Sequence, residues 1–328
     1  MKKLLLLLMM PVLCFGQTAE EYFNYAKEKA KLKDYNGAIA DYTKAIELDT
    51  NYINAYSNRG FAKNILEDYD GAIADYTKAI ELDPYDAYSY YSRAQSKRNL
   101  RDFKGAIEDY TKVIKITPTL SYAYNFRGQS RGSLGDFKGA IEDFTKYIEL
   151  EPNDANSYNF RGQTRGSLGD FNGAIEDLTK YIELEPNDAY AYYYRGFSKH
   201  MLGDYDGAKK DFTKEIKLSP SDVAYYNRGN SKDKLEDYSG AIKDYTKAIE
   251  MNPENIKAYF NRGFSKDNLK DYDGAIKDFT KVIELDPNDA WAYNRRGISK
   301  YQLNQNECPD FKRACELGDC ENYNKGCK

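Results

Sequence analysis

The sequence has few of the side chains that enzymes most often use for catalysis or metal binding. Its 328 residues include one histidine, His200, and one tryptophan, Trp291. A single histidine excludes metal sites built on a histidine pair, and it disfavours a nucleophile activated by a histidine base. The glycines form no phosphate-binding loop motif, and the acidic residues recur at regular intervals instead of converging as one pair. We therefore predict no catalytic residue, no metal and no cofactor.

Long hydrophobic runs are absent from all but the start of the chain. Lys2 and Lys3 precede the apolar run Leu4–Leu13, and a small residue stands just before Gln17. This order is typical of a secretory signal peptide, here residues 1–16, and the run is too short to span a bilayer comfortably. We predict that the protein is exported, either to the periplasm or out of the cell, and that it does not span a membrane.

Cys14 in this first segment raises the alternative of a lipid anchor. Bacterial lipoprotein signals have a small residue directly before the modified cysteine, whereas Leu13 stands there in this chain. Lipid attachment is therefore disfavoured, and we expect cleavage before Gln17 to remove Cys14.

An excess of positive charge is also absent. Lysine and arginine number 48 against 52 aspartates and glutamates, which gives a net charge of −4, and loss of Lys2 and Lys3 with the signal peptide changes it to −6. A chain of this sign repels the phosphates of nucleic acid. We predict a protein or peptide partner and no nucleic acid, and we make no prediction of the oligomeric state.

Repetition is the most prominent feature of the chain. The phrase FRGQSRGSLGDFKGAIEDFTKYIELEPND begins at Phe126, and a near copy begins 34 residues later at Phe160. A Gly-Ala pair recurs at this interval, apart from one interval of 33, with its glycine at positions 37, 71, 105, 139, 173, 207, 240 and 274. Such periodicity predicts one repeat array and not two unrelated domains.

The repeated unit predicts a helical hairpin. In residues 53–86, apolar and small residues recur three and four apart in two stretches, with Asp68 before the second stretch and Pro84 after it. This spacing indicates two amphipathic helices, the second of which is capped by Asp68 and ended by Pro84. Gly60 and Ala72 would allow the two helix backbones to approach closely. One hairpin cannot bury both of its faces, so the copies must stack on one another.

The aromatic, glycine, alanine and proline positions of this unit resemble the tetratricopeptide repeat. The resemblance implies an all-α fold, a right-handed α-solenoid of helical hairpins with eight full copies, a degraded ninth copy and a C-terminal cysteine-rich cap. The predicted segments are 17–303 for the array, with copies at 19–52, 53–86, 87–120, 121–154, 155–188, 189–221, 222–255, 256–289 and a partial 290–303, and 304–328 for the cap. Tyr147, Tyr181 and Glu215 replace a small residue of the family, so we expect altered packing in the middle copies.

Two charged columns run through the copies. Arginine occupies one position of the first helix in copies two to nine, as at Arg59, and aspartate occupies one position of the second helix in copies one to eight, as at Asp41. Because the first copy lacks the arginine and nothing precedes it, we predict that each arginine pairs with the aspartate of the preceding copy. A second basic column, which includes Lys63, is interpreted as solvated charge or as partners for nearby acids, and the alternative is a binding track for an acidic ligand. Asp310 resembles a further aspartate of the column without a partner.

Four of the five cysteines lie near the C-terminus, at Cys308, Cys315, Cys320 and Cys327. An even number in an exported chain indicates disulfides, and the spacing lacks the close pairs typical of a zinc site. Two cysteines precede and two follow a Gly-Asp pair that suits a turn between helices, and each flanking pair is separated by two helical turns. In an antiparallel helical hairpin this spacing predicts the disulfides Cys308–Cys327 and Cys315–Cys320, which would close a short cap over the last repeat.

The candidate binding site consists of first-helix positions that vary from copy to copy and are therefore not needed for stacking. By the resemblance they line a concave groove, which in the family receives an extended peptide or a helix of a partner. Aromatic side chains are suitable anchors, and amides can donate to and accept from a peptide backbone. The candidate residues are Tyr91, Asn125, Gln129, Asn159, Gln163, Tyr193, Phe197, Tyr226, Asn230, Asn261 and Arg295.

Gln129 and Gln163 stand in the twin phrases, and Asn125 and Asn159 stand directly before them; together they predict a two-by-two array of amides. If these side chains lie outside the stack, alanine at all four should leave the melting temperature nearly unchanged. The alternative is that the amides only keep an exposed face soluble.

The family's clamp for a C-terminal carboxylate is matched only in part. Asn230, Asn261 and Arg295 stand at three of its positions, whereas Tyr226 and Trp291 replace its two lysines, which disfavours a working clamp. We interpret the protein as a non-catalytic protein–protein interaction scaffold of the bacterial envelope. The alternatives are a glycan-binding envelope protein and a structural spacer.

Overall fold

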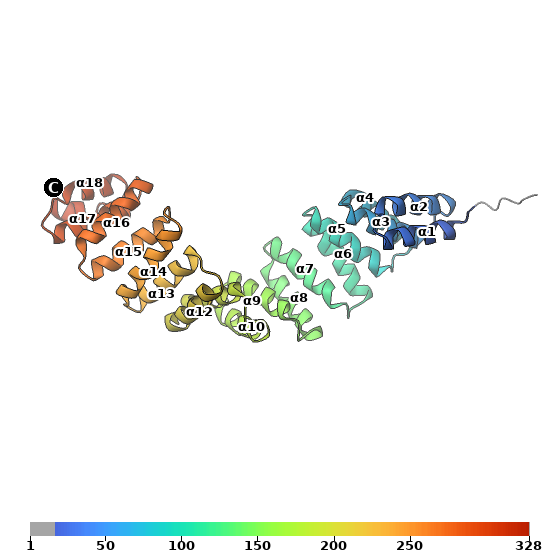
Figure 1. Ribbon diagram of the computed structural model, residues 1–328, viewed down its shortest axis with the longest axis horizontal. Coiled ribbons are helices and arrows are strands. Elements are labelled where there is room, and N and C mark those ends of the chain that lie inside the picture. The colour runs from blue at the N-terminus through green and yellow to red at the C-terminus, as the bar shows by residue number, and fades with distance from the viewer. Residues whose placement is uncertain (1–16, 328) are drawn as a thin grey trace, which may run out of the picture. The chain divides into compact units, whose positions relative to one another are not determined.

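The structure is a computed structural model that describes residues 17–327. All secondary structure in these residues is helical (Figure 1). None of the described helices combines the length and the apolar character that a bilayer crossing requires. The predicted signal peptide, with Cys14, lies outside the described residues.

The chain divides into two compact units at the bond between Leu150 and Glu151. The described helices of unit 1 are α1 (Ala19–Lys31), α2 (Tyr35–Leu48), α3 (Ile53–Ile65), α4 (Tyr69–Leu82), α5 (Ala87–Asn99), α6 (Phe103–Ile116), α7 (Ser121–Ser133) and α8 (Phe137–Leu150). Those of unit 2 are α9 (Ala155–Leu168), α10 (Phe171–Leu184), α11 (Ala189–Met201), α12 (Tyr205–Leu218), α13 (Asp222–Lys234), α14 (Tyr238–Met251), α15 (Ile256–Asn268), α16 (Tyr272–Leu285), α17 (Ala290–Gln302), α18 (Cys308–Glu316) and α19 (Glu321–Gly326).

Within each unit the helices form consecutive hairpins. Each odd-numbered helix from α1 to α17 packs against the helix that follows it, and each hairpin packs against the next hairpin of its unit (Figure 1). The predicted all-α solenoid of helical hairpins is confirmed. Tyr147, Tyr181 and Glu215, which replace a small residue, are all buried, and the boundary between the units lies just after Tyr147.

Each second helix begins at an aspartate that caps it, as predicted. In α4 the backbone N–H of Gly71 donates to Asp68 Oδ1 over 3.0 Å, and the equivalent bond recurs in the other copies. A Cβ on Gly71 would lie 2.1 Å from Asp68 Oδ2, so a larger residue there would displace the capping carboxylate. The recurring Gly-Ala pair therefore marks the capped start of a helix.

The two helices of a hairpin approach closely at a glycine of the first helix. A Cβ on Gly60 would lie 3.0 Å from Tyr76 Cε1 and 3.3 Å from the carbonyl oxygen of Ala72. Ala72 and Tyr76 are both fully buried. The predicted close approach is thus confirmed, and a larger residue at position 60 would displace the Tyr76 ring from a well-packed core.

The charged columns pair within each hairpin, so the prediction of pairing between copies is wrong. Arg59 Nη2 lies 2.7 Å from Asp75 Oδ1, and Lys63 Nζ lies 2.8 Å from Asp75 Oδ2. Asp75 belongs to the second helix of the same hairpin. The same group of one aspartate and two cations recurs in the later copies of both units. The second basic column therefore supplies partners for nearby acids, as one of its two interpretations held.

Threonine links the arginine column to the preceding copy. Arg59 Nη1 donates to Thr43 Oγ1 over 3.0 Å, and its guanidinium lies over the Tyr56 ring, 5.6 Å from the ring centroid. In the first copy, where Tyr25 replaces the arginine, Lys29 pairs with Asp41 at 2.7 Å. Lys29 stands at the position of Lys63, so Asp41 keeps the lysine of the second basic column as its partner although the arginine is missing.

Asp310 has two partners, in contrast to the sequence interpretation. Arg296 Nη2 lies 2.6 Å from Asp310 Oδ1, and Lys300 Nζ lies 2.7 Å from Asp310 Oδ2. Phe311 faces Gly297, where an added Cβ would lie 2.6 Å from Phe311 Cε1. Because these contacts repeat those of the other hairpins, α18 stands where the second helix of a ninth hairpin would stand.

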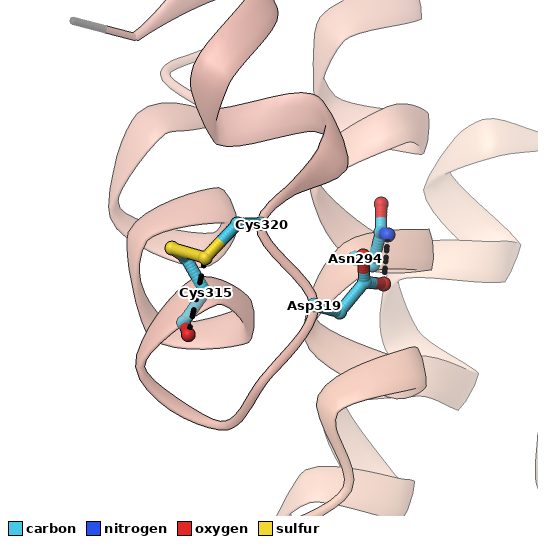
Figure 2. The surroundings of a disulfide bond; sticks show 4 residues. All are labelled: Asn294, Cys315, Asp319 and Cys320. Carbon is cyan, nitrogen blue, oxygen red and sulfur yellow. Dashed lines mark hydrogen bonds between the residues drawn. A yellow bond between two sulfur atoms is a disulfide. The ribbon is translucent and has the colours of Figure 1, made fainter.

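Both predicted disulfides are present in the C-terminal segment. Cys308 pairs with Cys327, with 5.5 Å between the Cα atoms, and Cys315 pairs with Cys320. Figure 2 shows that the second disulfide joins the end of α18 to the start of α19, across the turn that carries Asp319. The two bonds are nested, as expected for an antiparallel pair of helices.

Candidate functional site

The candidate residues of unit 1 are bonded to one another around Arg98. Gln129 Nε2 donates to Asn125 Oδ1 over 2.9 Å, and Arg98 Nη2 donates to Gln129 Oε1 over 2.9 Å. Asn125 is 6% exposed. It is therefore part of the packed interior, and the expectation that this amide lies outside the stack is wrong.

Aromatic rings surround this group in unit 1. The Tyr91 ring lies edge-on to the rings of Tyr110 and Phe126, with centroid distances of 5.8 and 6.1 Å. The Arg98 guanidinium lies 4.6 Å from the centroid of Phe126. Gln95 Nε2 donates to the Tyr91 hydroxyl over 3.0 Å, and burial raises the pKa of that hydroxyl. The side chains at the variable positions of α5 and α7 thus form a cluster in which most polar groups have a hydrogen-bond partner within the cluster.

In unit 2, Gln163 of the second twin phrase borders a small cavity. Gln163 Nε2 donates to Asn159 Oδ1 over 2.7 Å. Gln163 lines a cavity of about 160 Å³ together with Tyr193 and Phe197 of α11. Phe197 is 42% exposed, so its ring is accessible from solvent. The structure therefore brings three predicted site residues together here. The other two amides of the predicted array belong to unit 1.

A larger cavity of unit 2, which we call the groove cavity, has a volume of about 380 Å³. Its lining residues are His200, Asn230, Asp233, Lys234, Phe260, Asn261, Phe264, Trp291 and Arg295. They come from the first helices of four consecutive copies, α11, α13, α15 and α17. The predicted residues Asn230, Asn261 and Arg295 meet at this cavity.

A hydrogen-bond network fixes the amides of the groove cavity. Asn261 Nδ2 donates to Asn230 Oδ1 over 2.9 Å and lies 3.2 Å from the Tyr226 hydroxyl. Tyr245, which is fully buried, donates its hydroxyl to Asn230 Oδ1 over 2.9 Å. Among the described residues, no hydrogen bond reaches Asn230 Nδ2 or Asn261 Oδ1. One donor and one acceptor of known orientation are therefore left beside the cavity.

The charges at the groove cavity are mixed. The Arg295 guanidinium lies over Phe264, 4.9 Å from the ring centroid. Ser265 donates to Asp233 Oδ1 over 2.6 Å, and burial raises the pKa of Asp233. His200 Nδ1 lies 3.1 Å from the Ser231 hydroxyl, and burial, with the nearby Lys234 charge, lowers the pKa of His200. The imidazole is therefore neutral at pH 7, and the positive charge at this cavity comes from lysine and arginine.

The described residues include one group with the geometry of a metal site. Glu307, Cys308 and Cys327 have ligand atoms within 4.8 Å of one another. The two cysteines form a disulfide with each other, so neither offers the thiolate that a metal ion would need. This group therefore does not fit a metal.

Several residues that line the groove cavity were not predicted. Trp291, Phe260 and Phe264 occupy variable first-helix positions, and their aromatic character was a signal in the sequence. A serine that links successive copies was also missed: Ser299 donates to Asp267 Oδ1 over 2.7 Å, as Ser265 does to Asp233. A serine recurs in the first helix three positions after the arginine, and this recurrence was the sign of its role that the sequence offered.

The comparisons with known proteins identify the repeats. Family models described as tetratricopeptide repeat or TPR repeat match residues 26–64, 53–86, 87–120, 121–154, 155–188, 178–210, 223–255 and 256–289. A comparison with curated proteins finds no match.

Solved structures of similar proteins cover large parts of the chain. The crystal structure of the MamA protein is 30% identical, covers 52% of this chain and 93% of its own, and has a TM-score of 0.50. A tetratricopeptide repeat protein from Parabacteroides merdae is 20% identical over 76% of this chain and 99% of its own, with a TM-score of 0.53. The C-terminal part of a repeat protein from Cytophaga hutchinsonii is 20% identical over 73% of this chain and 98% of its own, with a TM-score of 0.64. The last two show likeness of fold.

Proposed function

Because the chain belongs to the tetratricopeptide-repeat family, we propose that it acts without catalysis as a protein–protein interaction scaffold. Its partner is an extended peptide segment that lies along the first helices, chiefly those of unit 2. The residues of this proposed site are Asn159, Gln163, Tyr193, Phe197, Tyr226, Asn230, Asn261 and Arg295, all of which belong to unit 2.

The observation that carries the proposal is the pair of oriented amides at the groove cavity. Asn230 has a free N–H donor and Asn261 a free C=O acceptor, and both side chains are held by the network that includes Tyr245. An extended peptide offers a C=O and an N–H in alternation, so it satisfies both groups at once. The amides are already ordered, so binding requires little further loss of side-chain entropy.

Aromatic side chains next to these amides supply pockets for the side chains of the peptide. Phe264 and the exposed Trp291 line the groove cavity, and Phe197 lines the smaller one. Aromatic residues in such positions are frequent binding hot spots. The proposal thus combines backbone recognition at the amides with side-chain anchoring at the aromatic rings.

A selection from a random peptide library tests this proposal. Peptides retained by the wild-type protein should bind the Asn230→Ala/Asn261→Ala variant at least about tenfold more weakly, a loss of about 1.4 kcal/mol. Asn24→Ala removes an exposed amide of α1 and should leave the affinity unchanged. Full retention of the peptides by the double variant would contradict the proposal. Retention of glycans alone would favour a glycan-binding protein, and retention of neither would favour a spacer.

We also propose that the protein is exported after cleavage before Gln17, and resides in the periplasm or outside the cell. The order of residues in the first segment and the two disulfides support this location, because disulfides persist in oxidising compartments. The intact mass of the protein recovered from its own cells should correspond to a chain that begins at Gln17. Retention of Met1, or a lipid on Cys14, would contradict export by this route.

A further inference from the structure

A third cavity of unit 2, which we call the cap cavity, lies between α17 and the turn that joins α18 to α19. Its volume is about 610 Å³, and small-molecule sites typically have roughly 300–1,000 Å³. The polar and aromatic residues that line it are Trp291, Asn294, Arg295, Asp319, Glu321 and Asn322. The size therefore suits a small ligand or one end of a larger one.

The outer wall of the cap cavity is fixed in place by covalent and hydrogen bonds. The disulfide Cys315–Cys320 closes the turn that carries Asp319, and Figure 2 shows Asp319 pointing toward Asn294 of α17. Asn294 Nδ2 donates to Asp319 Oδ2, and Asn322 Nδ2 donates to Asn294 Oδ1 over 2.6 Å. Hydrogen bonds to Asn294 of α17 thus hold this wall in place, so the site is already formed before a ligand binds.

Polar groups of both kinds remain for a ligand in the cap cavity. Among the described residues, Asp319 Oδ1, Asn322 Oδ1 and the Arg295 guanidinium have no hydrogen bond. A hydroxyl group donates and accepts, so adjacent hydroxyls can bond to an acceptor and a donor together. An anion would face the carboxylates of Asp319 and Glu321, and a cation would face Arg295. The lining therefore favours a neutral, hydroxyl-rich ligand.

Trp291 gives the cap cavity an apolar surface. Its side chain is 67% exposed. The face of an indole ring carries partial negative charge, and it packs well against the partly positive C–H bonds on the face of a sugar ring. Tyr190 occupies the same position of the first helix in copy six and is 73% exposed, but no cap lies near it. It offers a matched control.

We propose that the cap cavity binds a neutral saccharide, with one pyranose ring stacked on Trp291 and its hydroxyls bonded to Asp319, Asn322 and Arg295. This inference does not rest on the proposed peptide binding, because Asp319 and Asn322 of the cap take no part in the groove cavity. The two ligands would use different walls around Trp291 and Arg295, which line both cavities.

The chain has a single tryptophan, so all tryptophan emission comes from Trp291, which lines both this cavity and the groove cavity. The oxidised protein is first screened on an array of neutral hexoses, N-acetylhexosamines and deoxyhexoses. The best soluble binder is then titrated while Trp291 emission is followed, and we expect a saturable change. If no sugar of the array is retained, or if a retained sugar leaves the emission unchanged, the proposal is wrong.

Variants measured by calorimetry assign the binding to named residues. Trp291→Ala and Asn322→Ala should each weaken binding of the selected sugar by about tenfold or more, whereas Tyr190→Ala should bind as the wild type does. Cys315→Ser/Cys320→Ser should also weaken binding while the helical content is kept, because the wall is no longer closed. Equal affinity in the Trp291 and Tyr190 variants would overturn the proposal. If the emission responds only to peptides selected on the groove cavity, the saccharide proposal is also overturned. The proposed peptide binding would then still stand.

Discussion

Gln129 in unit 1 and Asn230 in unit 2 occupy the same position of the first helix, yet their surroundings differ. Gln129 accepts from Arg98 and donates to the buried Asn125, so both ends of its amide are engaged. Asn230 accepts from Asn261 and Tyr245, and its N–H group faces a cavity. This column belongs to the row of variable first-helix positions, which we call the stripe. In unit 1 the side chains of the stripe bond to one another, whereas in unit 2 part of the stripe is available for a ligand.

A neighbouring column explains this difference. Arg98 reaches from its own copy to Gln129 of the next copy, and its guanidinium covers Phe126. At the equivalent positions of unit 2 stand His200 and Asp233, which are shorter and are held by serines of the following copies. A long arginine therefore fills the space that two shorter residues leave open.

The largest expected effect shows what the two units have in common. Asp109→Leu in unit 1 and Asp244→Leu in unit 2 each leave two partly buried cations without a partner, which should cost about 3–5 kcal/mol. Native-state hydrogen exchange of α6 and α14 measures the local loss. Combining Asp109→Leu with Arg93→Leu should cost less than the sum of the single changes. A large loss in only one unit would show that the two stacks are built differently.

A pH-dependent effect is expected from one buried glutamate of unit 2. Burial raises the pKa of Glu215 to about 7 from an ordinary value of 4.5, and its Oε2 has no hydrogen-bond partner. The folded protein holds this proton more tightly than the unfolded chain does, so its stabilisation is complete below pH 4.5 and is lost as the pH rises through 7. The free energy of unfolding should fall by about 3 kcal/mol across this window.

Glu215→Gln is the variant that checks this pH dependence. It should remove the fall between pH 4.5 and 7 and stabilise α12 at pH 8, as measured by hydrogen exchange at each pH. Val113 occupies the same column in unit 1, so α6 provides an internal control without a titrating group at this position. An unchanged pH profile of α12 in the variant would rule out Glu215 as its source.

A smaller effect tests the role of Arg98 in closing the stripe of unit 1. Arg98→Ala removes a charged hydrogen bond to Gln129 and should lower the stability of α5 and α7 by about 1–2 kcal/mol. It should also speed hydrogen exchange around Asn125. Lys104→Ala, which removes an exposed cation from α6, should have little effect. If the two variants behave alike, Arg98 does not hold the cluster.

Much of the fold could be predicted because each copy repeats the same local signals. The capping aspartate and the glycine three residues later, as at Asp68 and Gly71, fix the start of every second helix without reference to other copies. The disulfide pairing followed from the spacing of four cysteines in a short hairpin, where few pairings are possible. These features depend on short separations along the chain, which the sequence displays directly.

The partners of long side chains could not be predicted in the same way. Along the chain, Asp41 precedes Arg59 and Asp75 follows Arg59 at nearly the same separation. Spacing alone therefore did not identify which aspartate pairs with the arginine. The first copy gave a misleading sign, because it lacks the arginine although its Asp41 pairs with Lys29 of the same hairpin. The buried Asn125 likewise accepts from Gln129, whose amide oxygen is bonded to Arg98 of another copy. Contacts between copies, and not the identity of the amide, determine which part of the stripe is open.

Hydrogen exchange of the protein, with and without a peptide selected on the wild type, tests the difference between the units most directly. The account predicts that the bound peptide slows exchange in α11, α13 and α15 of unit 2, whose side chains line the groove cavity. Exchange in α3, α5 and α7 of unit 1 should change little, because the stripe there is closed around Arg98. Protection confined to α5 and α7, with none in α13 and α15, would contradict the account.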